Sequence, residues 1–195
     1  KRSFQTLVYL PNFLSWVILA GILIDILSPS AGLVNVMLSK LGIEPVFFLG
    51  NPKVFPITMI ITEIWRSFGF GSVVYLAALT GIDPTLYESA KIDGANRWQQ
   101  TWHITMTGLT SIIVLMSVLS LANILNGGFD QIYNMYSPVV YSTGDILDTF
   151  VYRLGIEQAQ YSLSTAAGLF KSFVSLFFII ISYYLADRLA GYKVF

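Results

Sequence analysis

The sequence predicts an all-α integral membrane protein with about four transmembrane helices, on three observations. Hydrophobic residues make up 55% of the 195 residues and charged residues only 11%, whereas a soluble domain usually carries about 25% charged residues. Four stretches reach or approach the roughly 20 apolar residues that a spanning helix needs. Between two of them lies a polar segment with the pattern of a helix, a glycine turn and a second helix.

The four apolar stretches are residues 7–27, 54–79, 109–125 and 166–189. Pro11 interrupts the first stretch, because a proline inside a helix removes a backbone hydrogen bond. The second stretch contains Gly69 and Gly71, which are expected to let its helix bend or open. The chain as a whole, residues 1–195, is expected to form a single transmembrane domain.

Two longer connections separate these stretches. In residues 28–53, apolar residues recur at helical spacing from Leu33 to Leu41, which predicts a short helix in the membrane interface. Residues 126–165 open on Gly127-Gly128 and are rich in Tyr and Phe. Aromatic rings are common at the membrane surface, so this segment is expected to form a folded loop there. Its residues 127–131, Asp145 and Asp148 either meet a solute-binding protein or plug the bundle without a partner.

The polar segment begins at Asp83-Pro84, where Asp can cap a helix and Pro is tolerated at the first helical position. Gly94 is expected to end this helix, because glycine readily takes the left-handed conformation. In the helix that follows, Trp98 and Trp102 are four residues apart and share a face. Asp93 is expected to cap this second helix across the Gly94 turn.

This segment resembles the EAA loop, the cytoplasmic coupling loop of ABC importer permeases, whose form is roughly E-A-A-x-x-D-G-A followed by I-x-L-P. Glu88-Ser89-Ala90 stands for the opening triplet, and Asp93-Gly94-Ala95 matches the centre. Ile104-Thr105-Met106 stands where I-x-L is expected, and Thr107 replaces the usual proline. The coupling loop would span residues 82–107. Lys and Arg are modestly more frequent on its side of the membrane, as expected for the cytoplasmic face.

The resemblance implies that the loop docks in a groove of a separate ATPase subunit and transmits its movement to the membrane helices. The residues expected to make this coupling contact are Glu88, Ser89, Ala90, Asp93, Gly94 and Ala95. The stretches 9–17, 129–134 and 186–195 also resemble permeases of the carbohydrate type. By this resemblance the chain is a fragment that lacks one or more upstream membrane helices.

Five residues are candidates for the translocation path: Glu63, Trp65, Arg66, Asn123 and Asn126. Glu63 and Arg66 lie three apart within an apolar stretch, and ionisable residues there usually face a bundle interior or a water-filled path. The two side chains either line the path or form an internal ion pair. Asn and Trp side chains suit a neutral polyol, although Asn123 and Asn126 are equally able to make ordinary hydrogen bonds between helices.

Several classes of function are disfavoured. One histidine, no cysteine and no cluster with metal-ligand spacing leave little from which to build an enzyme active site or a metal centre. No glycine-rich phosphate loop is present, so ATP hydrolysis is assigned to a partner chain and no cofactor is expected. A net charge of zero gives no electrostatic argument for nucleic acid.

The resulting interpretation is a multi-pass permease subunit in the inner or plasma membrane, surrounded by lipid, that imports a sugar or an oligosaccharide. Its expected partners are ABC ATPase subunits, a second permease subunit, identical or different, and an extracytoplasmic solute-binding protein. Two alternatives remain open. One is an ABC permease for a non-sugar solute, and the other is a membrane assembly protein without transport activity.

Overall fold

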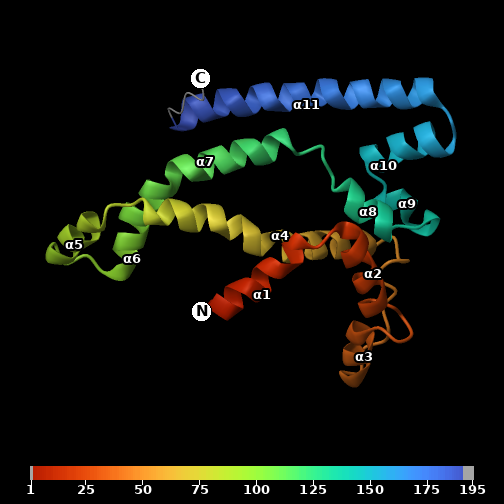
Figure 1. Ribbon diagram of the computed structural model, residues 1–195, viewed down its shortest axis with the longest axis horizontal. Helices are drawn as coiled ribbons and strands as arrows, with labels where there is room; N and C mark the ends of the chain where they lie inside the picture. The colour runs from red at the N-terminus through yellow and green to blue at the C-terminus, as the bar shows by residue number, and fades with distance from the viewer. Residues whose placement is uncertain (1, 191–195) are drawn as a thin grey trace. The chain divides into compact units, whose positions relative to one another are not determined.

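The computed structural model describes residues 2–190, and every regular element within them is a helix (Figure 1). Residues 191–195, which end the carbohydrate-permease resemblance at 186–195, lie outside the described part. The elements in chain order are α1 (Arg2–Phe13), α2 (Trp16–Ile26), α3 (Leu33–Lys40), α4 (Phe55–Thr80), α5 (Pro84–Ile92), α6 (Arg97–Gln100), the π-helix η1 (Thr101–Thr105), α7 (Met106–Ala122), α8 (Phe129–Met135), the 3-10 helix η2 (Pro138–Val140), α9 (Tyr141–Gly144), α10 (Leu147–Tyr152), the π-helix η3 (Arg153–Glu157) and α11 (Tyr161–Ala190).

The chain divides into two compact units. The first takes in the described residues of Lys1–Phe70 and Asn126–Lys171, and the second those of Gly71–Leu125 and Ser172–Phe195. The boundaries fall inside α4 and inside α11, so each of these helices contributes to both units.

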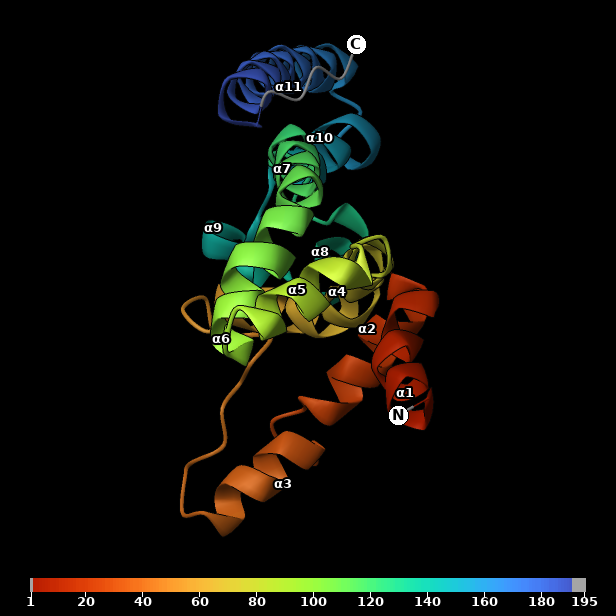
Figure 2. The same ribbon diagram turned by 90° about the vertical axis from the view of Figure 1, so that its left-hand side faces the viewer.

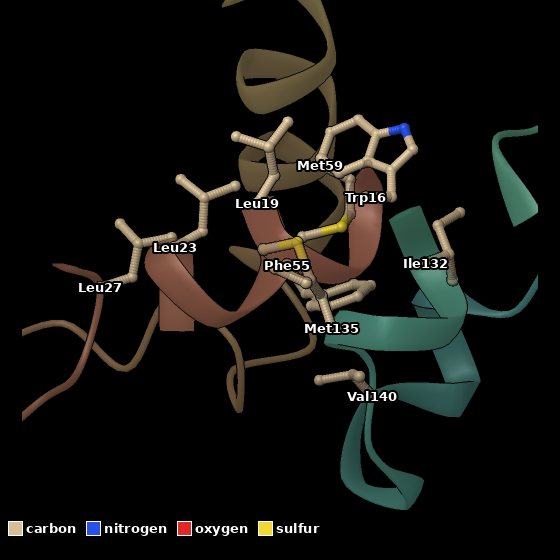
Figure 3. Close-up of a cluster of buried hydrophobic side chains, with 10 residues drawn as sticks. Trp16, Leu19, Leu23, Leu27, Phe55, Met59, Ile132, Met135 and Val140 are labelled. Atoms are coloured by element: carbon tan, nitrogen blue, oxygen red, sulfur yellow. The ribbon is translucent and has the colours of Figure 1, made fainter. Parts of the chain in front are cut away.

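The core of the first unit is formed where α2, α4 and α8 meet. Figure 3 shows Trp16 and Leu19 of α2 beside Met59 of α4 and Ile132 of α8. Phe55, at the start of α4, is fully buried in the same cluster. Segments more than 70 residues apart in the sequence therefore share one apolar core.

The first apolar stretch, residues 7–27, is two helices and not one. The chain leaves α1 after Phe13 and enters α2 at Trp16, and the Ser15 hydroxyl accepts a hydrogen bond from the Ile18 N–H. Ser is a favoured residue at a helix start because its oxygen pairs with a backbone N–H that the helix itself leaves free. The interruption thus lies beyond Pro11, which is inside α1.

The second apolar stretch forms α4, which continues without a break through Gly69 and Gly71. Gly69 is buried, and a Cβ added to it would overlap the carbonyl oxygen of Val8 in α1. Gly69 therefore permits a close approach of two helix backbones, as small residues do between membrane helices. A Cβ added to Gly71 would meet no atom of the described chain within 4 Å.

Two helical stretches among the described residues are long and apolar enough to cross a membrane: Arg97–Leu121 and Tyr161–Leu185. The first runs through α6, η1 and α7 as one uninterrupted helix, and the second lies within α11. They contain most of the apolar stretches 109–125 and 166–189. The short helix expected in residues 28–53 is α3.

Candidate functional site

The predicted coupling loop starts with a capped helix. Asp83 accepts a hydrogen bond from the Thr85 N–H at 2.9 Å, and Pro84 opens α5. This hydrogen bond holds the pKa of the Asp83 carboxyl below its ordinary value, because it stabilises the charged form. The expected helix start is confirmed.

Gly94 ends α5 in the conformation that the sequence predicted. Its φ is +79°, in the left-handed region that glycine tolerates best. The Gly94 N–H donates to the Lys91 carbonyl at 3.1 Å, and the Ala95 N–H donates to the Ala90 carbonyl at 2.8 Å. This pair of bonds is the Schellman motif, which satisfies the carbonyls that a helix end leaves free.

The residue that caps the second helix is Asn96, so the expectation that Asp93 would do so is wrong. The Asn96 side chain accepts from the Gln99 N–H at 2.9 Å, and the Asn96 N–H donates to the Gln99 side chain at 2.8 Å. The two residues form a reciprocal capping box. Asp93 follows Ile92 as the C-cap residue of α5, and it is exposed.

The second helix of the loop does not end at Met106-Thr107. It continues through η1 into α7, because Thr107 has the backbone N–H that the family's proline would lack. The Tyr87 hydroxyl of α5 and the Thr105 hydroxyl of η1 lie 2.8 Å apart and hydrogen-bond. This bond joins α5 to the helix that leads directly into α7.

The loop presents small and apolar residues to its surroundings. Of the six predicted coupling residues, Glu88, Ser89, Asp93 and Gly94 are exposed, whereas Ala90 and Ala95 are half-buried. The side chains of Ile92, Trp98 and Trp102 are 86%, 75% and 60% exposed. Figures 1 and 2 show α5 and α6 joined by the Gly94 turn at one end of the second unit.

A hollow of about 560 Å³ lies between α5 and the start of the second helix. Its lining is Tyr87, Lys91, Ala95, Asn96, Arg97, Gln100 and Thr101. Lys91 and Arg97 are cationic, and no carboxylate is among the described residues that line the hollow. The hollow is therefore suited to a partner's carboxylate.

The first unit contains a polar cavity of about 410 Å³. It brings together Glu63, Arg66 and Asn126, three of the five residues predicted for a translocation path. The full lining is Trp16, Glu63, Arg66, Asn126, Gly127, Gly128, Phe129, Asp130 and Gln131. Trp65, on the same helix, is not in this lining and its side chain is 49% exposed. Asn123 belongs to the other unit, where its side chain donates to the Leu119 carbonyl.

Glu63 and Arg66 do not form the internal ion pair that was the alternative interpretation. The Glu63 carboxylate accepts a hydrogen bond from the Ser67 hydroxyl. The Arg66 guanidinium donates to the Leu14 carbonyl at 3.4 Å and lies 4.8 Å from the centre of the Trp16 ring. Both residues line the polar cavity.

A second, mainly apolar cavity of about 360 Å³ shares Glu63, Gly127 and Gln131 with the polar cavity. Its remaining lining comes from residues 55–64 of α4, from Ile132 of α8 and from residues 143–146. The two cavities therefore meet at Glu63 and at the buried side chain of Gln131. A polar and an apolar surface side by side suit an amphipathic ligand such as a sugar ring.

The aromatic loop 126–165 is folded, as expected, and two ion pairs involve its residues. Arg153 pairs with Asp145 and lies 4.3 Å from the centre of the Tyr141 ring. The hydrogen bond with Asp145 raises the pKa of the Arg153 guanidinium. Lys171 pairs with Asp148 at 2.5 Å and donates to the Asn126 side chain at 3.0 Å.

Two tyrosines of this loop have altered acidities. The Tyr136 hydroxyl is buried and finds no hydrogen-bond partner among residues 2–190, and this burial raises the pKa of Tyr136 to about 12. A hydrogen bond with the Tyr152 hydroxyl raises the pKa of Tyr133.

Besides its two glycines, the polar cavity contains four residues that were not predicted for the translocation path: Trp16, Phe129, Asp130 and Gln131. Trp16 lies in an apolar stretch where nothing marks it as different from its neighbours. The other three belong to the outer loop 126–165, which was expected either to meet a solute-binding protein or to plug the bundle. The glycine pair Gly127-Gly128 before them was the available signal, since glycines allow close approach of a ligand.

Comparisons with known proteins agree with this architecture. The family described as "Binding-protein-dependent transport system inner membrane component" matches residues 1–191. The chain is 40% identical over 190 residues to the polygalacturonan/rhamnogalacturonan transport system permease protein YteP of Bacillus subtilis (strain 168), covering 97% of this chain and 58% of that protein. It is 38% identical over 188 residues to Protein LplB of the same organism, covering 96% of this chain and 59% of that protein.

Solved structures give the same result. A bacterial ABC transporter involved in the import of the acidic polysaccharide alginate contains a chain with a TM-score of 0.93 and 43% identity, covering 97% of this chain and 66% of that one. A second structure, the alginate transporter in complex with an alginate pentasaccharide-bound periplasmic protein, contains a chain with a TM-score of 0.94 and 43% identity. The match covers 99% of this chain and 67% of that one. This chain thus spans less than two thirds of the length of YteP and LplB. It belongs to the family of inner membrane components of binding-protein-dependent transport systems.

Proposed function

We propose that the full-length protein is a multi-pass permease subunit of an ATP-driven ABC importer. In this proposal the broken helix pair α1–α2 and the helices α4, α6–η1–α7 and α11 supply the four membrane segments of this part of the chain. At 26 residues, α4 is about 39 Å long, which is sufficient to span the hydrocarbon core. ATP is hydrolysed by a partner chain.

The observation that carries the proposal is the loop 82–107. A capped helix, a Schellman turn at Gly94 and a second capped helix form a compact projection with small residues at its turn. The Tyr87–Thr105 hydrogen bond and the unbroken helix through η1 into α7 connect this projection to a membrane-length helix. A push on the projection by an ATPase would be passed along that helix, and this is the mechanical requirement of coupling.

The substrate in this proposal is a sugar or oligosaccharide, and specifically an acidic one. YteP is named for polygalacturonan and rhamnogalacturonan, and the matched solved structure is named for the acidic polysaccharide alginate. The polar cavity combines the aromatic rings of Trp16 and Phe129 with amide, carboxylate and guanidinium groups. That mixture suits a ring with hydroxyl and carboxylate substituents better than it suits a small inorganic ion.

The partners in this proposal are ABC ATPase subunits, a second permease subunit, identical or different, and a solute-binding protein outside the membrane. The family description names a binding-protein-dependent system, and one matched structure is a complex with a periplasmic protein. Membrane lipid would cover the apolar side chains of α11, since many of them, such as Leu169, Phe173 and Phe177, are exposed within the described chain.

Uptake of a labelled uronate oligosaccharide into proteoliposomes tests this function. The vesicles would contain the full-length permease with its second permease and ATPase subunits, and the binding protein would be added outside. Uptake is expected to require ATP. Gly94→Trp is expected to leave the protein inserted in the membrane while abolishing uptake, because a bulky side chain at the turn blocks close docking.

Gly42 provides a matched control. It follows α3 in the same Schellman arrangement, with a φ of +78°, and like Gly94 it has open space around its Cβ position within the described chain. Gly42→Trp therefore carries the same backbone strain at a site away from the coupling loop. Normal uptake by Gly94→Trp, or equal loss in both variants, would contradict the proposed coupling role. Uptake that does not need ATP would contradict the importer function itself.

A further inference from the structure

We propose that Arg66 is the residue of the polar cavity that recognises the carboxylate of an acidic saccharide. This inference rests on the function proposed above and adds the position at which acidic and neutral substrates are distinguished. Arg66 is not one of the coupling residues, so its role is separable from docking to the ATPase.

The first argument is depth. Arg66 follows Phe55, the first residue of α4, by 11 positions, which places it about 16 Å along the helix. In a membrane-spanning α4 this is close to the middle of a hydrocarbon core about 30 Å thick. A cation there is costly unless it faces water or a compensating charge, and substrate sites of membrane transporters lie near this depth.

The second argument is that the described chain does not neutralise Arg66. No Asp or Glu oxygen among residues 2–190 lies within ion-pair distance of its guanidinium, whereas Arg153 and Lys171 each have a carboxylate partner. The Arg66 Nε is buried and has no hydrogen-bond partner there. The guanidinium therefore retains donors and a full charge for a ligand.

The third argument is that Arg66 is held in position. Its terminal nitrogen donates to the Leu14 carbonyl, at the break between α1 and α2, and its guanidinium lies against the Trp16 ring. Trp16 is buried in the core that joins α2, α4 and α8. A guanidinium fixed in this way loses little further freedom on binding, which favours the two parallel hydrogen bonds that guanidinium forms with carboxylate.

The carboxylates of the same cavity do not remove this role. Glu63 accepts a hydrogen bond from Ser67, and Asp130 lies in the first turn of α8, where the helix dipole favours a negative charge. Both can accept hydrogen bonds from sugar hydroxyls. An acidic sugar presents hydroxyl donors together with a carboxylate acceptor, so a cavity with acidic acceptors and one fixed guanidinium matches both kinds of group.

The alternative source of a partner for Arg66 is a carboxylate of the second permease subunit. In that arrangement Arg66 would stabilise the assembled complex and would not affect which saccharide binds. A test must therefore compare two ligands of one skeleton that differ only in charge.

Equilibrium binding to the purified full-length transporter, without the binding protein, provides this comparison. The two probes are trigalacturonate and its fully methyl-esterified form. Arg66→Gln is expected to weaken trigalacturonate binding roughly 10- to 100-fold, the range expected for a charged hydrogen-bonded pair. Binding of the ester is expected to change less than about threefold. Arg66→Lys keeps the charge but loses the planar fork, so an intermediate loss for trigalacturonate is expected.

Arg188→Gln is the matched control, because it removes the same side chain from an exposed position on α11, and it should leave the ratio of the two affinities unchanged. Equal weakening of both probes by Arg66→Gln, or an unchanged ratio, would overturn the proposal. If Arg66→Gln does not assemble, an unchanged ratio in Arg66→Lys would overturn it. The wild-type protein could take up trigalacturonate with ATP and yet bind trigalacturonate and its methyl ester with equal affinity. That result would overturn the proposed role of Arg66 and leave the proposed function intact. Absence of any ATP-dependent uptake would contradict the proposed function and the inference together.

Discussion

Gln131 and Thr62 are hydrogen-bonded to each other across 69 residues of sequence. The Gln131 Nε2 donates to the Thr62 Oγ1 at 2.8 Å and to the Met59 carbonyl at 2.8 Å. Thr62 in turn donates to the Thr58 carbonyl at 2.9 Å. Gln131 is only 3% exposed. These bonds attach α8 to the first third of α4, and Gln131 lines both cavities.

Gln131→Ala is expected to destabilise the purified protein by about 1–3 kcal/mol, the usual effect of removing a buried hydrogen-bond partner. Asn134→Ala is its control, because Asn134 is on the same helix and, among the described residues, its side chain bonds only to the Asp130 carbonyl of that helix. Thermal unfolding of the two variants in detergent measures the difference. Equal midpoints would show that the Gln131 bonds do not hold the two helices together.

Gly69→Ala is expected to disturb the packing of α1 on α4, because the added Cβ would meet the Val8 carbonyl. The neighbouring glycine gives the control. Gly71→Ala adds the same methyl group where the described chain leaves room, and alanine favours a helix by about 1 kcal/mol over glycine. Unfolding midpoints should therefore fall for Gly69→Ala and stay the same or rise for Gly71→Ala. A reversed order would contradict the close approach at Gly69.

Tyr136 gives a prediction for alkaline pH. Its pKa is raised from 10.0 to about 12 by burial, so the folded protein keeps this proton while the unfolded chain loses it above pH 10. The stabilising contribution is complete below pH 10 and is lost as the pH rises from about 10 to 12. Tyr136→Phe should show a shallower fall of the unfolding midpoint between pH 9 and 11. Tyr161→Phe, at an exposed position, should keep the wild-type slope, and identical slopes in all three proteins would refute this assignment.

The hollow beside the coupling turn leads to a prediction about charge. Lys91 and Arg97 line it without a carboxylate from the described chain, so the ATPase is expected to supply one. Reversing both charges, with Lys91→Glu and Arg97→Glu, should weaken association with the ATPase about tenfold or more at low salt and less at high salt. Reversing Lys40 and Lys53 in the loop 28–53 should have no such effect. If the variant with Lys91→Glu and Arg97→Glu associates with the ATPase as the wild type does, the hollow is not part of the contact.

Local features of the coupling loop were predictable because they depend on near neighbours. Asp83-Pro84 and Gly94 have strong conformational preferences, and both positions are confirmed. The error at Asp93 was avoidable, since Asn96 and Gln99 have the spacing of a capping box. The continuation of the helix through Thr107 was also predictable, because a residue with a backbone N–H allows a helix to continue where a proline would interrupt it.

The cavity was only partly predictable because its walls come from distant segments. Helical spacing indicates that Glu63 and Arg66 share a face, but it does not tell which segment covers that face. The structure brings Trp16 and Gln131 to it and leaves Trp65 outside. The break of the first apolar stretch at Leu14–Ser15 supplies the carbonyl that holds Arg66, and apolar periodicity alone gave no signal for it.

The central claim is that residues 87–98 dock on an ATPase, and the absence of native cysteine makes this directly testable. A single cysteine would be placed at Ser89, which is exposed, or at Ala95 in the full-length permease, and another in the docking groove of the ATPase. A disulfide or short cross-link whose yield changes when ATP binds is the predicted result. If the ATPase assembles with the permease but no position from Tyr87 to Trp98 cross-links to it, the loop is not the docking element. If no ATPase associates at all, the importer function is contradicted and a membrane assembly role is favoured.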